Sequence, residues 1–493
     1  MSRNPKRGGG ATAALLTILI LLMIAATAFV IWLCIDMTNR TPDTTSQQES
    51  VVQLPTSAVT QPPETEPPVT ETEPEPEHVV ATATIASMGD LLMHLPVINT
   101  CQQSDGSYDF SSIFQYVKDT VSSYDYAAVN LETTFGGSDY PIQGNPHFNC
   151  PDSLAQAALD AGYDMFLTAN NHCGDTTADG ILRTLEQSRG VGLKTLGTQM
   201  NDEEKKFEIV DVNGIKIGMI AYTYATSVTS DGRPSLNGNA ALSQVGIVNY
   251  FMENNLEAFY TELEQRLAQM KQDGAEATIV YLHWGVEYLL EENSTQRAIA
   301  QKLCDLGVDV IIGGHPHVVE PIDLLESTVD PNHKSVILYS MGNAVSNQRQ
   351  GNLSMISTAH TEDGVLFAVT FEKYSDGTVY LAGAEVVPTW VNMHSNNGSR
   401  EYNILPLDID KKEEWTSLFN LTQANYDAAA KSYDRTMEIV GEGLTECQTW
   451  LEQAKTDREN YYLELARNPG MTQQTQPTVT ETIAEETTLP AAA

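Results

Sequence analysis

The sequence predicts an α/β domain, with strands layered under helices, over residues 79–405. Two observations support this prediction. Short β-rich runs alternate with helix-like segments from Val79 onward. Five of the apolar runs also end at or next to a side chain that can bind a metal ion. Ligands of open α/β sheets bind at the carboxyl ends of strands, so this pattern suits such a fold.

The first residues predict a membrane anchor. Residues 1–10 contain Arg3, Lys6 and Arg7 and no acidic side chain, and residues 11–35 contain no charge. This uncharged run is long enough to cross a hydrocarbon core of about 30 Å. The basic flank predicts a single-pass protein of the cell membrane, with a cytoplasmic N-terminus and an extracellular main domain. A cleavable signal peptide is the alternative, although its apolar core is usually only about 7–15 residues long.

Two segments have the composition of disordered chain. Residues 36–78 are rich in Thr, Pro and Glu, and residues 469–493 return to Thr, Gln, Pro and Glu. Such segments bury too little apolar surface to offset the entropy lost on ordering. We expect a spacer between the anchor and the domain, and a disordered tail at the end.

Strands and helices are expected in turn along the domain. The predicted single strands are 83–88, 127–131, 165–167, 278–282, 308–312 and 336–340. The predicted helices are 110–123, 153–161, 182–188, 251–271 and 296–306. Tight hairpins are expected at Asn213-Gly214 and at Asp376-Gly377.

A helical extension is predicted over residues 406–468. Apolar residues recur there at helical spacing, including Val440, Leu444 and Leu451. The sequence does not decide whether this extension packs on the main domain or on a partner.

Charge and cysteine content limit the possible partners. The chain has 65 acidic and 27 basic residues, a formal net charge of −38. This balance argues against nucleic acid as a partner, because such binding needs a basic surface. The six cysteines form no CxxC pair. Cys101 and Cys150 are either a disulfide of an exported domain or two buried thiols.

The run Ile311-Ile312-Gly313-Gly314-His315-Pro316-His317 carries two histidines at the end of an apolar segment. Residues i and i+2 of an extended segment point to the same side, and the proline disfavours a helical turn at the first histidine. Imidazole is the commonest ligand for zinc-like ions. The pair therefore indicates half a metal site, the alternative being an ordinary surface loop.

Five candidate ligands occupy equivalent places at the ends of apolar runs. They are Asp90, Glu132, Asn171, His283 and His315. Each alone has an ordinary explanation, such as a turn cap or a hydrogen-bonded core residue. Together they predict a site for one or two divalent cations, since a carboxylate can bridge two metals.

Further candidates lie beside these positions. His172 follows Asn171 directly, so we expect it near the metals as a general acid or a stabiliser of negative charge. A buried histidine with a satisfied partner is the alternative. His94 and Glu287 each follow a candidate ligand by four residues and are weaker candidates for supporting roles.

Six short motifs together resemble a known family. They are Gly89-Asp90, Asn130-Leu131-Glu132, Asn170-Asn171-His172, His283-Trp284-Gly285-Val286-Glu287, Gly314-His315-Pro316-His317 and Gly342-Asn343. Their order resembles that of the bacterial capsule-synthesis proteins of CapA type, which are linked to poly-γ-glutamate production. That family is similar to the calcineurin-like metallophosphoesterases, and the resemblance implies a two-sheet sandwich flanked by helices around a dinuclear centre.

The resemblance implies a role for each matching residue. Asp90 corresponds to the first metal carboxylate and Glu132 to the bridging one. Asn171 and His172 correspond to a ligand and a catalytic acid, with His283, His315 and His317 as the remaining ligands and Asn343 as a residue behind them. The implied cofactor is one or two divalent ions of the Mn, Zn or Fe class.

The chain departs from the phosphoesterase pattern at two positions. Leu92 stands where that superfamily usually has a histidine, and Glu132 stands where it usually has a bridging aspartate. These changes leave open whether one or two ions are bound and whether the protein is an enzyme.

Three functions are compatible with these features. The first is a membrane-anchored, external metal-dependent hydrolase acting on a cell-envelope polymer such as poly-γ-glutamate or on its intermediates. The second is a non-catalytic scaffold that contacts membrane proteins of a polymer synthase or export complex. The third is a protein that binds an anionic polymer through its metal without cleaving it.

Overall fold

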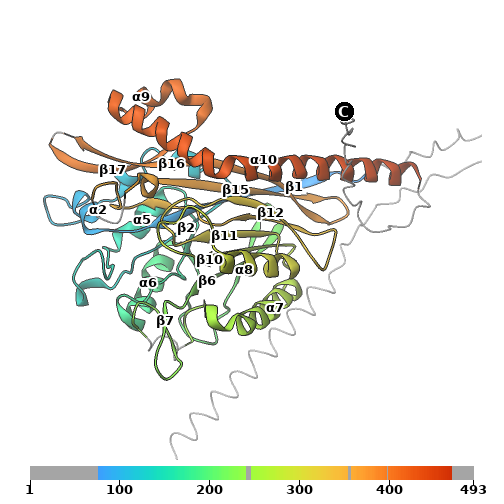
Figure 1. The fold of residues 1–493 in the computed structure, drawn as a ribbon, viewed down its shortest axis with the longest axis horizontal. Coiled ribbons are helices and arrows are strands. Elements are labelled where there is room, and N and C mark those ends of the chain that lie inside the picture. The colour runs from blue at the N-terminus through green and yellow to red at the C-terminus, as the bar shows by residue number, and fades with distance from the viewer. Residues whose placement is uncertain (1–75, 240–245, 353–356, 397, 469–493) are drawn as a thin grey trace, which may run out of the picture. The chain divides into compact units, whose positions relative to one another are not determined.

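The predicted alternation of strands and helices is present in the computed structural model, which describes residues 76–239, 246–352, 357–396 and 398–468 (Figure 1). The predicted anchor, most of the spacer and the tail lie outside these residues. Among the described helices, none combines the length and the apolar character that a membrane crossing requires.

The first sheet has eight strands in the described chain, in the order β17-β16-β15-β1-β2-β3-β4, with β14 beside β1. The strands are β1 (Val79–Leu91), β2 (Tyr126–Asn130), β3 (Met165–Leu167), β4 (Lys194–Leu196), β14 (Asn343–Val345), β15 (Asp363–Tyr374), β16 (Val379–Asn396) and β17 (Ser399–Pro406). Strands β1 to β4 are parallel, so their carboxyl ends meet at one edge of the sheet.

The second sheet has seven described strands, in the order β12-β13-β11-β10-β6-β5, with β9 beside β6. Its strands are β5 (Glu208–Val212), β6 (Ile215–Tyr224), β9 (Tyr250–Phe251), β10 (Ala277–His283), β11 (Val310–Gly314), β12 (Ile322–Glu326) and β13 (Lys334–Leu338). Strands β6, β10, β11 and β13 are parallel to one another. A separate ribbon pairs β7 (Ser227–Val228) with β8 (Pro234–Ser235).

One hydrophobic core lies between the two sheets. Ile85 and Phe367 of the first sheet and Ile279 and Ile312 of the second belong to the same buried cluster. Alternate residues of a strand point to opposite faces, so Val280 joins a different cluster on the outer face of the second sheet. Burial on both faces explains why the parallel strands read as continuous apolar runs in the sequence.

Helices cover the outer faces of both sheets (Figure 1). On the first sheet lie α2 (Leu95–Thr100), α3 (Ser111–Phe114), α4 (Lys118–Val121) and α5 (Ser153–Asp160). On the second lie α7 (Leu256–Gln272) and α8 (Ser294–Asp305). Helix α6 (Thr177–Val191) buries its apolar side in a smaller cluster with Leu236, Ile247 and Val248. The helix predicted over 110–123 is therefore two short helices, α3 and α4.

The helical extension packs on the same domain. After η5 (Ile409–Glu414) and α9 (Trp415–Leu418), the long helix α10 (Gln423–Arg467) lies along the sandwich (Figure 1). Val440, Leu444 and Leu451 of α10 enter the core between the sheets. A Cβ atom at Gly443 would lie 1.7 Å from the carbonyl oxygen of Ile322, so glycine permits the close approach of α10 to β12.

Both predicted hairpins are confirmed. Strands β5 and β6 pair antiparallel around Asn213 and Gly214, whose φ angles of 55° and 85° fit a tight turn that favours these residues. Strands β15 and β16 pair around Asp376-Gly377. Cys101 and Cys150 are buried free thiols.

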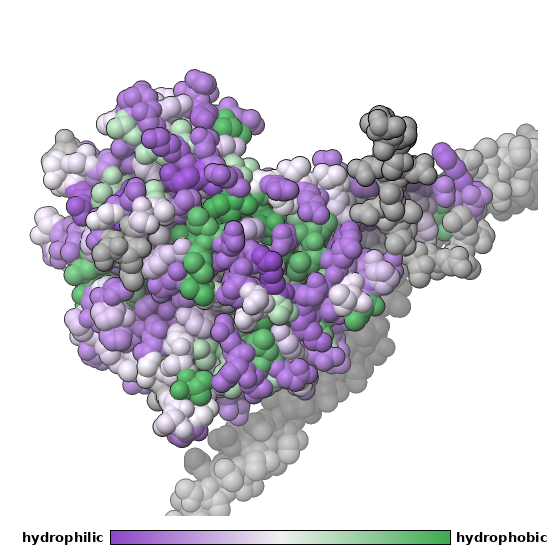
Figure 2. Space-filling model, in the orientation of Figure 1, coloured by the Kyte–Doolittle hydropathy of each residue, from purple (hydrophilic) through white to green (hydrophobic). Residues whose placement is uncertain are grey.

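The visible surface is mainly hydrophilic, with hydrophobic residues gathered near the middle of one face (Figure 2). This distribution agrees with the strongly acidic composition of the chain. High net charge keeps a protein solvated and attracts cations.

Candidate metal centre

The candidate ligands lie at the carboxyl ends of parallel strands from both sheets. Asp90 is the penultimate residue of β1, His283 is the last residue of β10, and His315 follows β11 directly. Glu132 lies two residues after β2. Each of these four residues is at most 4% exposed, so acidic and imidazole groups lie in the interior of the sandwich.

Glycines allow the backbone segments to meet closely enough. A Cβ atom at Gly89 would lie 1.9 Å from the carbonyl oxygen of Gly342, and one at Gly313 would lie 1.8 Å from that of Tyr339. The N–H of Asp90 donates to the carbonyl oxygen of Gly342 at 3.0 Å. These contacts hold the ends of β1 and β11 against the chain around β14.

The histidine loop has a strained backbone. His315 and His317 have φ angles of 101° and 58°, in a region that residues other than glycine rarely adopt. Each such residue costs on the order of 1–3 kcal/mol and persists only where its surroundings hold it. The side-chain amide of Asn343 donates to the carbonyl oxygen of His317 at 3.2 Å, and the N–H of Tyr288 donates to that of Pro316 at 2.8 Å.

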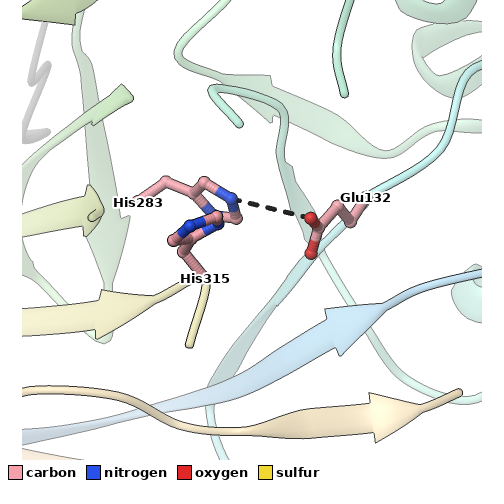
Figure 3. A group of neighbouring side chains, drawn as sticks. All are labelled: Glu132, His283 and His315. Atoms are coloured by element: carbon pink, nitrogen blue, oxygen red, sulfur yellow. Dashed lines mark ion pairs between the residues drawn. The ribbon is translucent and has the colours of Figure 1, made fainter. Parts of the chain in front are cut away.

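Two groups of three possible ligands share Glu132. One consists of Glu132, His283 and His315, and the other of Asp90, Glu132 and His317, with the ligand atoms of each group within 4.8 Å of one another. Figure 3 shows the imidazoles of His283 and His315 side by side, near the carboxylate of Glu132. The arrangement suits two cations that share one carboxylate.

Individual contacts connect the two groups. His317 Nδ1 lies 3.0 Å from Asp90 Oδ2, and His317 Nε2 lies 3.9 Å from Glu132 Oε1. His283 Nε2 lies 3.6 Å from the same glutamate oxygen and 2.7 Å from Asn171 Oδ1. The structure therefore brings together all six residues predicted as metal ligands.

Burial controls the charge of the centre. It raises the pKa of Glu132 well above its ordinary value, and the negative charge of Asp90 raises it further. Burial also lowers the pKa values of His283 and His315 well below the ordinary value, with a smaller contribution from neighbouring histidines. The imidazoles are thus neutral at neutral pH, which is the form that binds metal ions.

The side chains present fit divalent cations. Both carboxylate oxygens of Glu132 and Nδ1 of His315 are buried, and none has a hydrogen-bond partner. Buried polar atoms nearly always have partners, because leaving one unsatisfied costs about 1–3 kcal/mol or more. A donor set of imidazole nitrogens and carboxylate oxygens suits ions of the Zn, Mn or Fe class.

His172 lies beside the ligands and contacts a carboxylate. Its Nδ1 is 2.7 Å from Asp175 Oδ2, and its side chain is 12% exposed. The positive charge of a protonated His172 would lower the pKa values of His283 and His315, which places it near both. Phe148 packs edge-on against the ring at 4.7 Å and donates its N–H to Asp175.

The three weaker candidates surround the centre. Asn343 is fully buried and supports the histidine loop. His94 is part-buried, packs against Phe148 and accepts a hydrogen bond from the N–H of Asn347. Burial lowers the pKa of His94 to about 4, with a further contribution from His317. Glu287 is exposed, and its charge contributes to the raised pKa of the central glutamate.

Four residues that support the site had no role predicted from the sequence. Asn130 donates to Asp90 Oδ1 at 2.7 Å, and Asn170 donates to Asn130 Oδ1 at 3.2 Å, which forms a buried chain behind the first carboxylate. The available signal was position, because each asparagine lies one or two residues before a candidate ligand. Asp175 and Tyr224 contact His172 and His315, and the spacing of the candidate ligands did not reveal either contact.

Two curated relatives are similar to this chain. The "PGA biosynthesis protein CapA" of Bacillus subtilis (strain 168) is 28% identical over 265 residues, 53% of this chain and 62% of the relative. The chain thus covers about three fifths of that relative's length. The "Capsule biosynthesis protein CapA" of Bacillus anthracis is 25% identical over 351 residues, 68% of this chain and 75% of the relative.

Among solved structures, the NAD nucleotidase of Haemophilus influenzae matches with a TM-score of 0.35 and 13% identity, over 72% of this chain and 67% of that one. A TM-score this low carries no argument about the site. The model of the family described as "Bacterial capsule synthesis protein PGA_cap" matches residues 84–348, which include every candidate site residue. Since this match covers more than half of the 493 residues, the chain belongs to the PGA_cap family of bacterial capsule synthesis proteins.

Proposed function

We propose that the protein is a metal-dependent hydrolase that acts on a cell-envelope polymer, such as poly-γ-glutamate, or on its intermediates. One observation carries the proposal most directly. Glu132 is a buried carboxylate with no hydrogen-bond partner, and it is shared by two groups of possible ligands. The names of the two relatives support the polymer, since both refer to capsule or PGA biosynthesis.

Each side chain has a role in this proposal. Asp90, Glu132, Asn171 and the three histidines of the centre hold one or two divalent ions. Such ions supply Lewis acidity and lower the pKa of water. His172 donates a proton from Nε2 to the leaving group, while Asp175 accepts from Nδ1 and fixes the orientation of the ring.

The proposal places this chemistry outside the cell. The uncharged run at residues 11–35, preceded only by basic charges, supports a retained membrane anchor. The Thr-, Pro- and Glu-rich segment after it would hold the domain away from the lipid. This location suits a protein that handles a polymer of the cell surface.

The test uses the full chain loaded with Mn²⁺ or Zn²⁺. Hydrolysis of chromogenic phosphoesters and of poly-γ-glutamate is measured for the wild type, for Glu132→Gln and for His172→Ala. We expect chelator-sensitive hydrolysis of at least one substrate class, lost in the first variant and slowed about 10²–10⁴-fold in the second. His394→Ala, on β16 and outside the centre, is the control. A wild type that shows no hydrolysis and binds no metal would contradict the proposal.

A scaffold without catalytic activity is the second candidate. The observation that favours it is Leu92, which is 1% exposed. The metallophosphoesterases that the chain resembles usually have a histidine at this position. Capsule output in cells separates the candidates. A scaffold predicts normal output with His172→Ala and loss of output when residues 11–35 are removed. The hydrolase predicts that the histidine substitution alone reduces output.

A further inference from the structure

A tyrosine at the end of β6 contacts one of the candidate ligands. The hydroxyl oxygen of Tyr224 lies 3.0 Å from Nε2 of His315, and the two rings pack with centroids 4.8 Å apart. Tyr224 pairs with Phe251 of β9, so the strand register fixes its position at the edge where the ligands meet. The phenol is therefore the hydrogen-bond partner of one of the two ring nitrogens of His315.

The other ring nitrogen of His315 is the one without a partner, so it remains available to the centre. Nδ1 is buried and has no hydrogen-bond partner, whereas Nε2 faces Tyr224. A neutral imidazole that binds a metal through one nitrogen carries its proton on the other. A cation bound at Nδ1 thus requires an N–H at Nε2, and the phenol oxygen must accept that hydrogen bond.

We propose that Tyr224 is a positioning residue for metal binding, because its hydroxyl accepts the Nε2–H of His315 and holds Nδ1 toward the ion shared with Glu132 and His283. This inference rests on the proposed metal centre and extends it to a residue in neither ligand group. Partners behind histidine ligands fix the tautomer and ring orientation, and their loss typically weakens metal affinity about 10–100-fold.

The backbone of His315 is strained, so the position of this ligand depends on the contacts around it. Its φ angle of 101° is one that residues other than glycine rarely adopt, and the residue before it is Gly314. Among the described residues, the phenol of Tyr224 is the side chain hydrogen-bonded to this ring.

The test compares Tyr224→Phe with Tyr222→Phe in the full chain. Tyr222 lies two residues earlier on β6, is 1% exposed, and its hydroxyl has no hydrogen-bond partner. Zn²⁺ affinity is measured by competition with a chromophoric chelator, and thermal unfolding is measured without metal. We expect Tyr224→Phe to lower the affinity for one Zn²⁺ ion about 10–100-fold. Tyr222→Phe should leave Zn²⁺ affinity unchanged. In a His315→Ala background, Tyr224→Phe should have no further effect.

A second measurement reads the tautomer of His315 in the wild type itself. Histidine ¹⁵N NMR of the Zn²⁺-loaded wild type, with His315 assigned from its substitution, should show a proton on Nε2 and metal on Nδ1. Metal on Nε2, or unchanged Zn²⁺ affinity in Tyr224→Phe, overturns the role of Tyr224 and leaves the proposed function standing. A wild type that binds no Zn²⁺ overturns both.

Discussion

Two buried carboxylates in this molecule have opposite surroundings. Asp363, the first residue of β15, is 2% exposed and fully paired, with Arg435 Nε at 2.8 Å, Arg435 Nη2 at 2.7 Å and Ser432 Oγ at 2.6 Å. Glu132 is 0% exposed, and neither of its oxygens has a hydrogen-bond partner. The first carboxylate attaches helix α10 to the sandwich, whereas the second lies among possible metal ligands.

The difference indicates what each group is for. Burial raises the pKa of Asp363 to about 6, and the hydrogen bonds and charge of Arg435 oppose that rise. For Glu132, no hydrogen bond or positive charge of the described residues lowers the pKa in this way, and burial and the charge of Asp90 both raise it. A structural carboxylate is satisfied by the protein itself. An unsatisfied one calls for a partner from outside the chain, which in the proposed function is a cation in place of a proton.

Other buried carboxyl groups lie between these extremes. Glu320 accepts a hydrogen bond from Gln296 at 2.7 Å through one oxygen, and its other oxygen has no partner. Asp175 accepts from Phe148 and contacts His172. Substitutions of such groups test whether buried carboxylates that lack hydrogen-bond partners act in metal binding, and whether fully paired ones act in fold stability.

Glu132→Gln should produce the largest effect on metal binding. The substitution removes the carboxylate shared by both ligand groups, so we expect metal affinity to fall more than about 100-fold, beyond the loss typical of supporting residues. The metal-free protein should unfold at the same temperature as the wild type or above it, because a neutral amide replaces a buried acid. Metal analysis and thermal unfolding measure these quantities. Unchanged metal content would mean that Glu132, like Asp363, has no role in metal binding.

His172→Ala should reduce the rate without reducing metal content. Its ring contacts Asp175, and in the proposed mechanism it supplies a proton. We expect hydrolysis to slow about 10²–10⁴-fold. A loss of bound Zn²⁺ comparable to that of His283→Ala would instead make His172 a ligand.

Arg435→Met should destabilise the fold and leave the centre intact. It leaves Asp363 buried without its charged partner, and such a loss costs about 3–5 kcal/mol. Lys411→Met, which breaks the exposed contact with Asp408, should cost far less, because solvent screens an exposed ion pair. Denaturant unfolding measures both variants. Equal effects would mean that the pairing of Asp363 contributes little.

Glu320 should affect neither metal binding nor the stability at low pH, and should appear as a pH dependence of stability. Burial raises its pKa from 4.5 to about 8. Between these values the folded state holds more protons than the unfolded state, so the free energy of unfolding falls as pH rises, by up to about 1.4 kcal/mol per pH unit. Urea unfolding of chelator-treated protein from pH 5 to 8 should show a flatter slope in Glu320→Gln than in the wild type. Identical slopes would show that folding does not raise the pKa of Glu320.

The sequence predicted much of the fold, because buried parallel strands have distinct apolar runs. The prediction for residues 165–167 coincides with β3, and that for 278–282 lies within β10. Strand β17 was not predicted, although it pairs along β16 in a hairpin. The charged residues Arg400 and Glu401 interrupt its apolar pattern near its start, so periodicity gives a weak signal there.

The ligands were predictable because they lie at or just past the ends of strands, and parallel strand ends of one sheet meet at one edge. Their supporting contacts were not predictable in this way. The pairing of Tyr224 with His315 joins residues 91 positions apart and depends on β6 and β11 both lying beside β10. Asp175 lies only three residues after His172, but the turn that lets them meet is a property of the folded loop.

Anomalous diffraction from full-length protein crystallised with Zn²⁺ or Mn²⁺ would locate the ions directly. We predict at least one anomalous peak about 2.0–2.2 Å from a carboxylate oxygen of Glu132, with a histidine of the centre as a further ligand. Ions bound only at the acidic surface, with Glu132 still unpaired, would contradict the assignment of this carboxylate to a metal.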